Sequence, residues 1–314
     1  MSKQKVSDSP QRKMIFNKKK KKNRLNDYSG SEWAKASISV FKFDGTIPDK
    51  RKEHGAAFPF TLAKHFILTY TKEGNLIFDP FVGVGTTTDA AMLLGRKSIG
   101  IDINKKFIRL AKKGPDSIDM KHSESFLDRV TNEQVHKPQI YCDDSLNMLK
   151  YVEPKSVDLI LTSPPYGNLL RLIRPKFADK LLFIDKSNGQ KISKELKNPQ
   201  VYSDLDEDLG NMEYQNYLEK IGKIFDLTYR VAKKNTYAVW VVKDYRDIKN
   251  GIPYMNLHGD IINIATQNKW ILWDIVIWDQ TDRRPLVVLG YPSRNFYANI
   301  GHSFILIFKK KYVS

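Results

Sequence analysis

The sequence predicts an α/β protein built around a doubly wound, mostly parallel β-sheet. From residue 54 onward, short runs rich in β-branched residues alternate with amphipathic helical patterns, an order typical of parallel strands covered by helices. Hydrophobic residues make up 41% of the 314 residues, which is enough to bury a substantial core. The last apolar run follows the sixth without a helical pattern between them, because 279–301 is rich in Pro, Gly, Arg and Asn. We therefore expect the last strand to return antiparallel.

Seven apolar runs have the length and composition of strands. They are Asn75–Asp79, Lys97–Asp102, Gln139–Cys142, Val157–Thr162, Thr236–Lys243, Ile271–Trp278 and Ser303–Lys309. Between them, apolar residues recur with helical spacing at Leu62–Thr71, Thr86–Leu94, Lys105–Lys112, Tyr214–Val231 and Gly259–Gln267. Two long stretches, 114–138 and 167–211, interrupt this alternation. Loops of that length in a compact α/β domain are usually functional.

The chain is strongly basic, with 52 Lys and Arg against 35 Asp and Glu and a formal net charge of +17. Residues 1–30 hold ten basic and two acidic residues, so we expect a mobile basic arm there and a single folded domain over 31–314. The insertion 167–211 begins with a second basic stretch, 168–197. Basic segments of this kind favour a polyanion, and nucleic acid first, as partner. A solubilising tail is the alternative interpretation of the arm.

Several classes of protein are disfavoured by composition. The only cysteine, Cys142, cannot form a disulfide within the chain, and the six histidines show no metal-ligand spacing. There is no apolar stretch of the signal-peptide type, and apolar runs stop far short of the ~18 residues that span a bilayer. We expect a cytoplasmic protein without metal or membrane partners.

The run Phe78–Thr87 follows a predicted strand and opens a predicted helix, which is where an open α/β sheet binds its ligand. Gly83 and Gly85 let the backbone approach a ligand closely. Thr88 stands where the dinucleotide fingerprint has its third glycine, which disfavours nicotinamide and flavin cofactors. Asp79 would repel a pyrophosphate but would suit an ammonium group. A tight turn without a ligand is the alternative.

Acidic residues also follow the next two predicted strands. Asp102 lies at a distance along the chain where a carboxylate accepts hydrogen bonds from ribose hydroxyls. A ribose beside an ammonium group, without phosphate, describes S-adenosylmethionine. After the third strand, Asp143 or Asp144 meets an adenine amino group in one interpretation, and Asp144 or Ser145 caps a helix in the other. The sequence leaves these two interpretations open.

The fourth predicted strand ends in Thr162–Gly167, with the sequence TSPPYG. Two consecutive prolines lack amide donors and have fixed φ angles, so they hold a rigid bend whose carbonyls can point into a cleft. An exocyclic amine could donate one hydrogen to the Pro164 carbonyl and one to the Ser163 hydroxyl, leaving its lone pair free to attack a sulfonium methyl. Tyr166 would offer an aromatic face to a base removed from its stack. A stiff loop is the usual role of an isolated proline pair, but this place in the sheet favours catalysis.

Together, the motifs Asp79–Thr87 and Thr162–Tyr166 resemble those of the amino-group DNA methyltransferases, which modify cytosine N4 or adenine N6. His54–Pro59 is similar to the segment before the glycine turn in that family, Ile99–Asp102 to its ribose-binding position, and His302–Lys309 to its closing strand. The resemblance implies a class I methyltransferase (Rossmann-like) fold, S-adenosylmethionine as donor, double-stranded DNA as substrate and base flipping.

These inferences give two sets of candidate residues. The expected catalytic residues are Ser163, Pro164, Pro165 and Tyr166. The expected cofactor-binding residues are His54, Phe58, Asp79, Pro80, Phe81, Gly83, Gly85, Thr86, Thr87, Asp102, Asp143 and Asp144.

Cytosine N4 is the expected acceptor, because relatives that act on adenine more often carry Asp at the position of Ser163. Methylation of a ring carbon is rejected, since Cys142 follows Tyr141 rather than a proline in a catalytic loop. The cofactor motif precedes the catalytic motif here, whereas many relatives have the reverse order. Because only five residues follow Lys309, we expect sequence recognition in the 167–211 insertion, the 279–299 loop or the arm.

Other functions remain open at this stage. The expected role is methylation within a restriction-modification system, with a cognate endonuclease encoded separately. Adenine-N6 methylation of DNA and guanine-N2 methylation of RNA or tRNA are alternatives that use the same donor. A nucleic-acid-binding protein without catalytic activity is a third, but its motifs would then be expected to have decayed.

Overall fold

A computed structural model describes most of the folded chain. It covers residues 25–43, 57–117, 119–121, 135–166, 205, 207–247, 251–282 and 296–310, and the backbone alone at 180–184, 191–195 and 286–287. The expected basic arm falls almost entirely outside these residues.

The centre of the molecule is an eight-stranded sheet with the order β1-β11-β13-β8-β5-β2-β3-β4. All seven expected strands are present, as β2 (Leu76–Asp79), β3 (Lys97–Asp102), β4 (Gln139–Cys142), β5 (Val157–Thr162), β8 (Ala232–Val242), β11 (Trp270–Asp279) and β13 (His302–Lys310). The eighth, β1 (Val40–Phe41), pairs with the end of β11 and was not predicted, because two residues carry no periodicity. The expectation that the last strand is antiparallel is confirmed, since β13 runs antiparallel to both β11 and β8.

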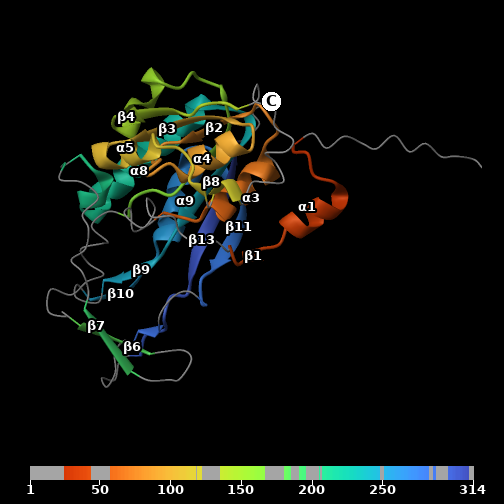
Figure 1. The fold of residues 1–314 in the computed structure, drawn as a ribbon. Coiled ribbons are helices and arrows are strands. Elements are labelled where there is room, and N and C mark those ends of the chain that lie inside the picture. The colour runs from red at the N-terminus through yellow and green to blue at the C-terminus, as the bar shows by residue number, and fades with distance from the viewer. Residues whose placement is uncertain are drawn as a thin grey trace, which may run out of the picture.

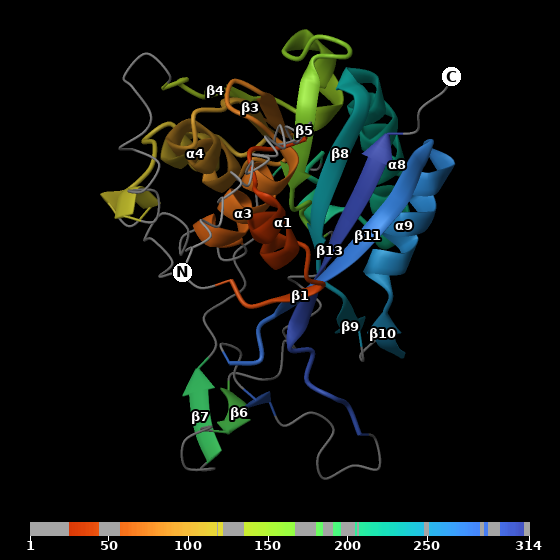
Figure 2. The ribbon, with the colours of Figure 1, turned by 90° about the vertical axis from the view of Figure 1, so that its right-hand side faces the viewer.

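Helices cover both faces of this sheet (Figure 2). α3 (Phe60–Tyr70) and α4 (Thr86–Leu93) pack on one face, and α8 (Tyr214–Val231) and α9 (Leu257–Gln267) on the other. α5 (Lys105–Ala111) follows β3 and packs against β3 and β4. The five predicted helices are therefore confirmed, with starts that differ by up to two residues. α9 begins before Gly259 because the Asn256 side chain accepts the Gly259 amide and caps the helix.

The strand order determines where a ligand can bind. β2 lies between β3 and β5, and it runs parallel to both. The chain leaves β2 toward β3 on one side and later returns to β5 on the other, which opens a crevice at the carboxyl ends of these strands. The doubly wound α/β fold expected from the sequence is confirmed by this arrangement.

Two small sheets lie at this same end of the central sheet (Figure 1). β9 (Tyr245–Asp247) and β10 (Ile252–Met255) form a hairpin directly after β8. β6 (Lys180–Ile184) pairs with β7 (Lys191–Glu195) and with β12 (Leu286–Val287). The third sheet therefore joins the 167–211 insertion to the 279–299 loop, which are the two segments expected to recognise DNA.

Part of the expected arm belongs to the folded body. Asn26 is 1% exposed and donates a 2.5 Å hydrogen bond to the Thr69 carbonyl of α3. The Asp27 carboxylate lies 3.8 Å from the buried guanidinium of Arg96. Contacts with residues distant in sequence therefore hold Asn26 and Asp27. α1 (Gly30–Ala36) follows, with Ser29 and Glu32 forming a capping box.

None of the helices in the described part of the chain is long and apolar enough to cross a membrane.

Candidate active site and cofactor pocket

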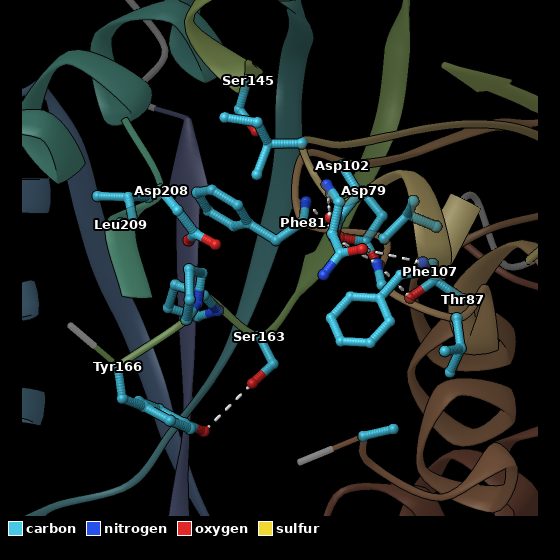
Figure 3. Close-up of a pocket in the computed structure, with 18 of the residues that line it drawn as sticks. Asp79, Phe81, Thr87, Asp102, Phe107, Ser145, Ser163, Tyr166, Asp208 and Leu209 are labelled. Carbon is cyan, nitrogen blue, oxygen red and sulfur yellow. Dashed lines mark hydrogen bonds between the residues drawn. The ribbon is translucent and has the colours of Figure 1, made fainter. Parts of the chain in front are cut away.

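A cleft with about 810 Å³ of empty volume, including its mouth, lies at the carboxyl ends of β2, β3 and β5 (Figure 3). It brings together most of the residues predicted from sequence. These are Phe58, Asp79, Phe81, Gly83, Thr86, Thr87, Asp102, Asp144, Ser163, Pro164, Pro165 and Tyr166.

Asp79 lies at the end of β2, in the centre of the sheet, and is 2% exposed. One carboxylate oxygen accepts hydrogen bonds from the Thr162 hydroxyl at 2.6 Å and the Phe81 amide at 3.0 Å. The other accepts from the Thr87 hydroxyl at 2.6 Å. Burial raises the pKa of Asp79 to about 6, although these three hydrogen bonds lower it. A cationic ligand in the cleft would favour the charged form.

Asp102 ends β3 and faces the glycine turn. Its carboxylate accepts hydrogen bonds from the Gly83 amide at 2.9 Å and the Asn104 amide at 2.8 Å. Burial, with a smaller contribution from the negative charges of Asp208 and Asp79, raises the pKa of Asp102 to about 7, although the two backbone hydrogen bonds lower it. The cleft therefore concentrates negative charge, which suits a ligand with positive groups and hydroxyl donors.

The glycine turn has the backbone that the sequence predicts. Gly85 has φ = 90° and is the N-cap residue of α4. A Cβ at this position would lie 3.1 Å from both the Cα and the Cβ of Ala111 on α5. The turn therefore needs glycine for both its dihedral angle and its packing.

The two acidic residues after β4 have different surroundings. Asp144 lines the cleft and also caps the 3₁₀ helix η2 (Ser145–Lys150) by accepting the Leu146 amide at 2.9 Å. Asp143 is absent from the described lining and bonds instead to Asn147 and to Tyr151 at 2.8 and 2.7 Å. These hydrogen bonds hold the pKa of Asp143 at about 2, although partial burial opposes them. Asp144, rather than Asp143, is therefore the candidate for a contact with the adenine amino group of the cofactor.

Ser163 and Tyr166 form the other end of the cleft. The Ser163 hydroxyl donates to the Val241 carbonyl of β8 at 3.0 Å, and its oxygen lies 3.2 Å from the Tyr166 hydroxyl (Figure 3). Because the single Ser163 proton is used on Val241, Tyr166 is the donor of the second bond. One lone pair of the Ser163 oxygen then stays available to accept a hydrogen from a ligand.

Sequence reasoning missed part of the lining. Three of the missed lining residues follow Asp102 in the chain, namely Ile103, Asn104 and Phe107. Their position directly after an acidic residue at the end of a strand could have indicated that they line the cleft. Glu207, Asp208, Leu209 and Lys220 also line the cleft, and their sequence pattern gave no such signal.

Some predicted positions do not line the described cleft. His54 lies outside the described residues. The Pro80 carbonyl accepts a hydrogen bond from the Ser145 hydroxyl. Gly85 sets the backbone conformation of the turn as the N-cap residue of α4. Pro80, Gly85 and Asp143 therefore support lining residues without being among them.

Comparison with known families decides which methyltransferases these motifs belong to. The family model for N6- and N4-type DNA methylases matches residues 1–113 and 157–314. The chain belongs to this DNA methylase family. The unmatched stretch, 114–156, contains the long interruption at 114–138 and both Asp143 and Asp144.

Curated relatives of this chain agree with that assignment over shorter stretches. The orphan methyltransferase M.BamHII of Bacillus amyloliquefaciens is 44% identical over 61 residues, 19% of this chain and 23% of that protein. The type II methyltransferase M2.DpnII of Streptococcus pneumoniae is 48% identical over 74 residues, 24% of this chain and 25% of that protein. The DNA adenine methyltransferase YhdJ of Escherichia coli is 37% identical over 70 residues, 22% and 24% respectively. Each match covers about a quarter of the relative's length.

Among solved structures, an S-adenosylmethionine-dependent methyltransferase from Methanosarcina mazei gives a TM-score of 0.44 at 13% identity, over 78% of this chain and 96% of that chain. The fold assignment therefore rests on the strand order of this chain itself.

The methyl donor of the family is S-adenosylmethionine, as expected from the sequence. The cleft fits this cofactor in its chemistry. Asp79 suits the ammonium group, Asp102 suits the ribose hydroxyls, and Ile103 and Phe107 offer apolar surface to a planar base.

Proposed function

We propose that this DNA methylase transfers a methyl group from S-adenosylmethionine to the exocyclic amine of a flipped base in double-stranded DNA. Cytosine N4 is the proposed acceptor. The observation that carries this proposal is the orientation of the Ser163 hydroxyl by Val241 and Tyr166, in a cleft that Asp79 and Asp102 also line.

The geometry supports transfer to an amine rather than to a carbon. The Ser163 oxygen is held as an acceptor, so it can take one hydrogen of an incoming amino group. The Pro164 carbonyl would take the other, because two consecutive prolines stiffen the chain there. Both hydrogen bonds draw the nitrogen lone pair out of conjugation with the ring, which makes the nitrogen a better nucleophile.

When bound, S-adenosylmethionine supplies an electrophilic methyl group on a sulfonium. The Asp79 and Asp102 carboxylates would hold its cationic and ribose ends away from Ser163 and Tyr166. Tyr166 would stack on the flipped base, a contact worth ~1–3 kcal/mol in other nucleic-acid complexes. After transfer, the donor sulfur is left as a neutral thioether, the methylated nitrogen gives its extra proton to water, and no covalent bond to the enzyme forms.

Adenine N6 is the second candidate acceptor. It is favoured by the similarity to YhdJ, whose name gives adenine as its substrate base. Cytosine N4 is favoured by Ser163, because a serine is neutral where adenine-specific relatives more often carry a carboxylate. The proposed setting is a restriction-modification system, as the type II methyltransferases among the relatives suggest, with any endonuclease encoded separately.

One experiment tests the reaction and the acceptor together. The gene is expressed in a host free of DNA methylation, and nucleosides from its DNA are analysed by mass spectrometry. N4-methylcytosine is the expected product. N6-methyladenine would move the acceptor to the second candidate, and a methylated ring carbon would overturn the assignment of the cleft.

A parallel assay tests the polymer. Purified protein is incubated with tritiated S-adenosylmethionine and either duplex DNA or bulk tRNA. Label on the DNA alone is expected. Label on tRNA alone would replace the proposal by RNA methylation, and label on neither would favour a protein without catalytic activity.

A further inference from the structure

Lys220 joins two walls of the cleft that come from different parts of the chain. It lies on α8, and its ammonium is 2.8 Å from the Asp144 carboxylate and 2.5 Å from the Glu207 carbonyl. Its side chain is 11% exposed. A lysine held by both a carboxylate and a carbonyl fixes the distance between the groups that it bonds.

Each wall also has local hydrogen bonds that shape it. Asp144 uses one carboxylate oxygen on the Leu146 amide and the other on Lys220, so its orientation is set from both sides. On the opposite wall, Asp208 caps the 3₁₀ helix η3 (Leu209–Asn211) by accepting the Gly210 amide at 2.8 Å. Leu209 is buried beside it and lines the cleft.

The charges around Lys220 explain why a cation is needed there. Asp79, Asp102, Asp144, Glu207 and Asp208 all line the cleft, whereas Lys220 is the sole basic side chain among its described lining residues. Without Lys220, the Asp144 carboxylate and the Glu207 carbonyl would lose the ammonium that they share, and their oxygens would lie close together. Oxygens that carry negative charge repel each other in a partly buried site when no cation lies between them. Residues 207–211 would then move away from η2 and open the cleft.

We propose that Lys220 is a positioning residue that holds residues 207–211 against Asp144 and so closes the cofactor pocket. This inference rests on the proposed function, because it takes S-adenosylmethionine as the ligand of the cleft. Lys220 orders the protein groups around the cofactor and takes no part in the transfer itself.

The test compares Lys220→Met with a matched control, Lys223→Met. Lys223 is an exposed lysine on the same helix, outside this cleft. S-adenosylhomocysteine, which cannot react, is titrated into each purified full-length protein by calorimetry. Lys220→Met should weaken binding about tenfold, the equivalent of ~1.4 kcal/mol. Lys220→Arg should recover most of the affinity, and Lys223→Met should bind like the wild type.

Hydrogen exchange supplies a second readout that distinguishes closure of the pocket from general stability. Amides of residues 207–211 should exchange about tenfold faster in Lys220→Met than in the wild type, while those of β5 and β8 stay protected. If Lys220→Met does not fold, Lys220→Gln replaces it, because glutamine has no charge but keeps a polar amide at the end of a side chain that is one atom shorter.

The outcomes separate the two proposals. A wild-type protein that does not bind S-adenosylhomocysteine would overturn the proposed function and this inference together. A wild type that binds, with a folded Lys220 variant of equal affinity and equal exchange, would overturn the role of Lys220 alone.

Discussion

The hydroxyl of Thr162 donates a 2.6 Å hydrogen bond to the Asp79 carboxylate, and this bond joins the end of β5 to the end of β2. Both side chains are buried, so neither exchanges this partner for water. Ser163 is the next residue after Thr162. The proposed cofactor end and the proposed base end of the cleft are therefore linked through one buried hydrogen bond.

Replacing Asp79 by asparagine should separate its charge from its structural role. The Asn oxygen can still accept from Thr162 and Phe81, and its amide can donate to the Thr87 hydroxyl. Thr87 then turns its own hydrogen to the Leu161 carbonyl, which already lies 3.4 Å away. We expect Asp79→Asn to fold and to bind S-adenosylmethionine at least tenfold more weakly in calorimetry. Retained affinity would remove Asp79 from the ammonium site.

Cofactor binding should depend on pH because of the raised pKa values of Asp79 and Asp102, about 6 and 7. Below these values the carboxyls are neutral in the free protein, and a positive ligand must drive a proton off to bind. Affinity for S-adenosylmethionine should therefore rise from pH 5.5 to 7.5, with proton release detectable in buffers of different ionisation enthalpy. A flat profile would contradict this account, and Asp79→Asn should make the profile shallower.

The same shifts have the opposite sign for stability without ligand. Both folded pKa values lie above the usual 3.8, so the folded protein binds more protons than the unfolded chain between about pH 4 and 7. The free energy of unfolding from these two groups must then fall as pH rises through that window. Thermal melts of Asp79→Asn and wild type should converge at pH 4, and the variant should melt higher at pH 8.

Tyr166 should matter for the reaction more than for the cofactor. Tyr166→Ala removes both the ring and the donor to Ser163, and should slow turnover ten- to a hundredfold with donor affinity nearly unchanged. Tyr166→Phe keeps the ring and should lose less than tenfold. Single-turnover assays with duplex DNA measure the rate of methyl transfer in both variants. Equal losses in the two variants would assign the effect to the hydroxyl rather than to stacking.

Gly85 and Gly74 allow a matched test of the glycine turn. Their φ angles are 90° and 75°, but a Cβ at Gly74 would meet nothing within 4 Å, whereas one at Gly85 would press on Ala111. Gly74→Ala should cost about 1–2 kcal/mol of unfolding free energy through its dihedral angle. Gly85→Ala should cost a further ~1–3 kcal/mol because of overpacking. Urea unfolding measures the free energy of unfolding of both variants. Equal decreases in the two variants would exclude the packing contribution.

The basic insertion is predicted to contact DNA, although 168–179 lies outside the described residues. Replacing three basic residues there by glutamine should weaken DNA binding and flatten its salt dependence by ~0.9 log units per lost phosphate contact. The replaced residues are Arg171, Arg174 and Lys176. The control replaces exposed lysines at the amino ends of the strands, namely Lys97, Lys155 and Lys234. Equal salt slopes in both variants would move the interface to the arm or to the 279–299 loop.

Much of the fold could be predicted because its signals are local. The strands of the central sheet are buried on both faces and appear as continuous apolar runs such as Val157–Thr162, and the helices between them keep a 3.6-residue period. β1 and β12 could not be predicted, because each has two residues and exists only through its pairing with β11 or β6.

The candidate site also has a part that local sequence predicts and a part that only tertiary contacts determine. Ser163, Tyr166, Asp79 and Asp102 follow strands that must end at one edge of a parallel sheet, so their proximity follows from their positions in the sequence. Asp143 and Asp144 were indistinguishable, because both follow β4 directly. Their tertiary partners distinguish them. The Asp143 carboxylate bonds to Tyr151, whereas the Asp144 carboxylate bonds to Lys220 and lies in the cleft.

The sequence by itself determined the order of strands and helices, the glycine turn and the rigid proline bend, because each depends on residues within a few positions of one another. Tertiary packing decided which distant groups share the cleft. Lys220 meets Asp144 across 76 residues, and Ser163 meets Val241 across 78. Such contacts leave no periodic pattern in the chain, because they arise only when α8 packs against η2 and β8 pairs with β5.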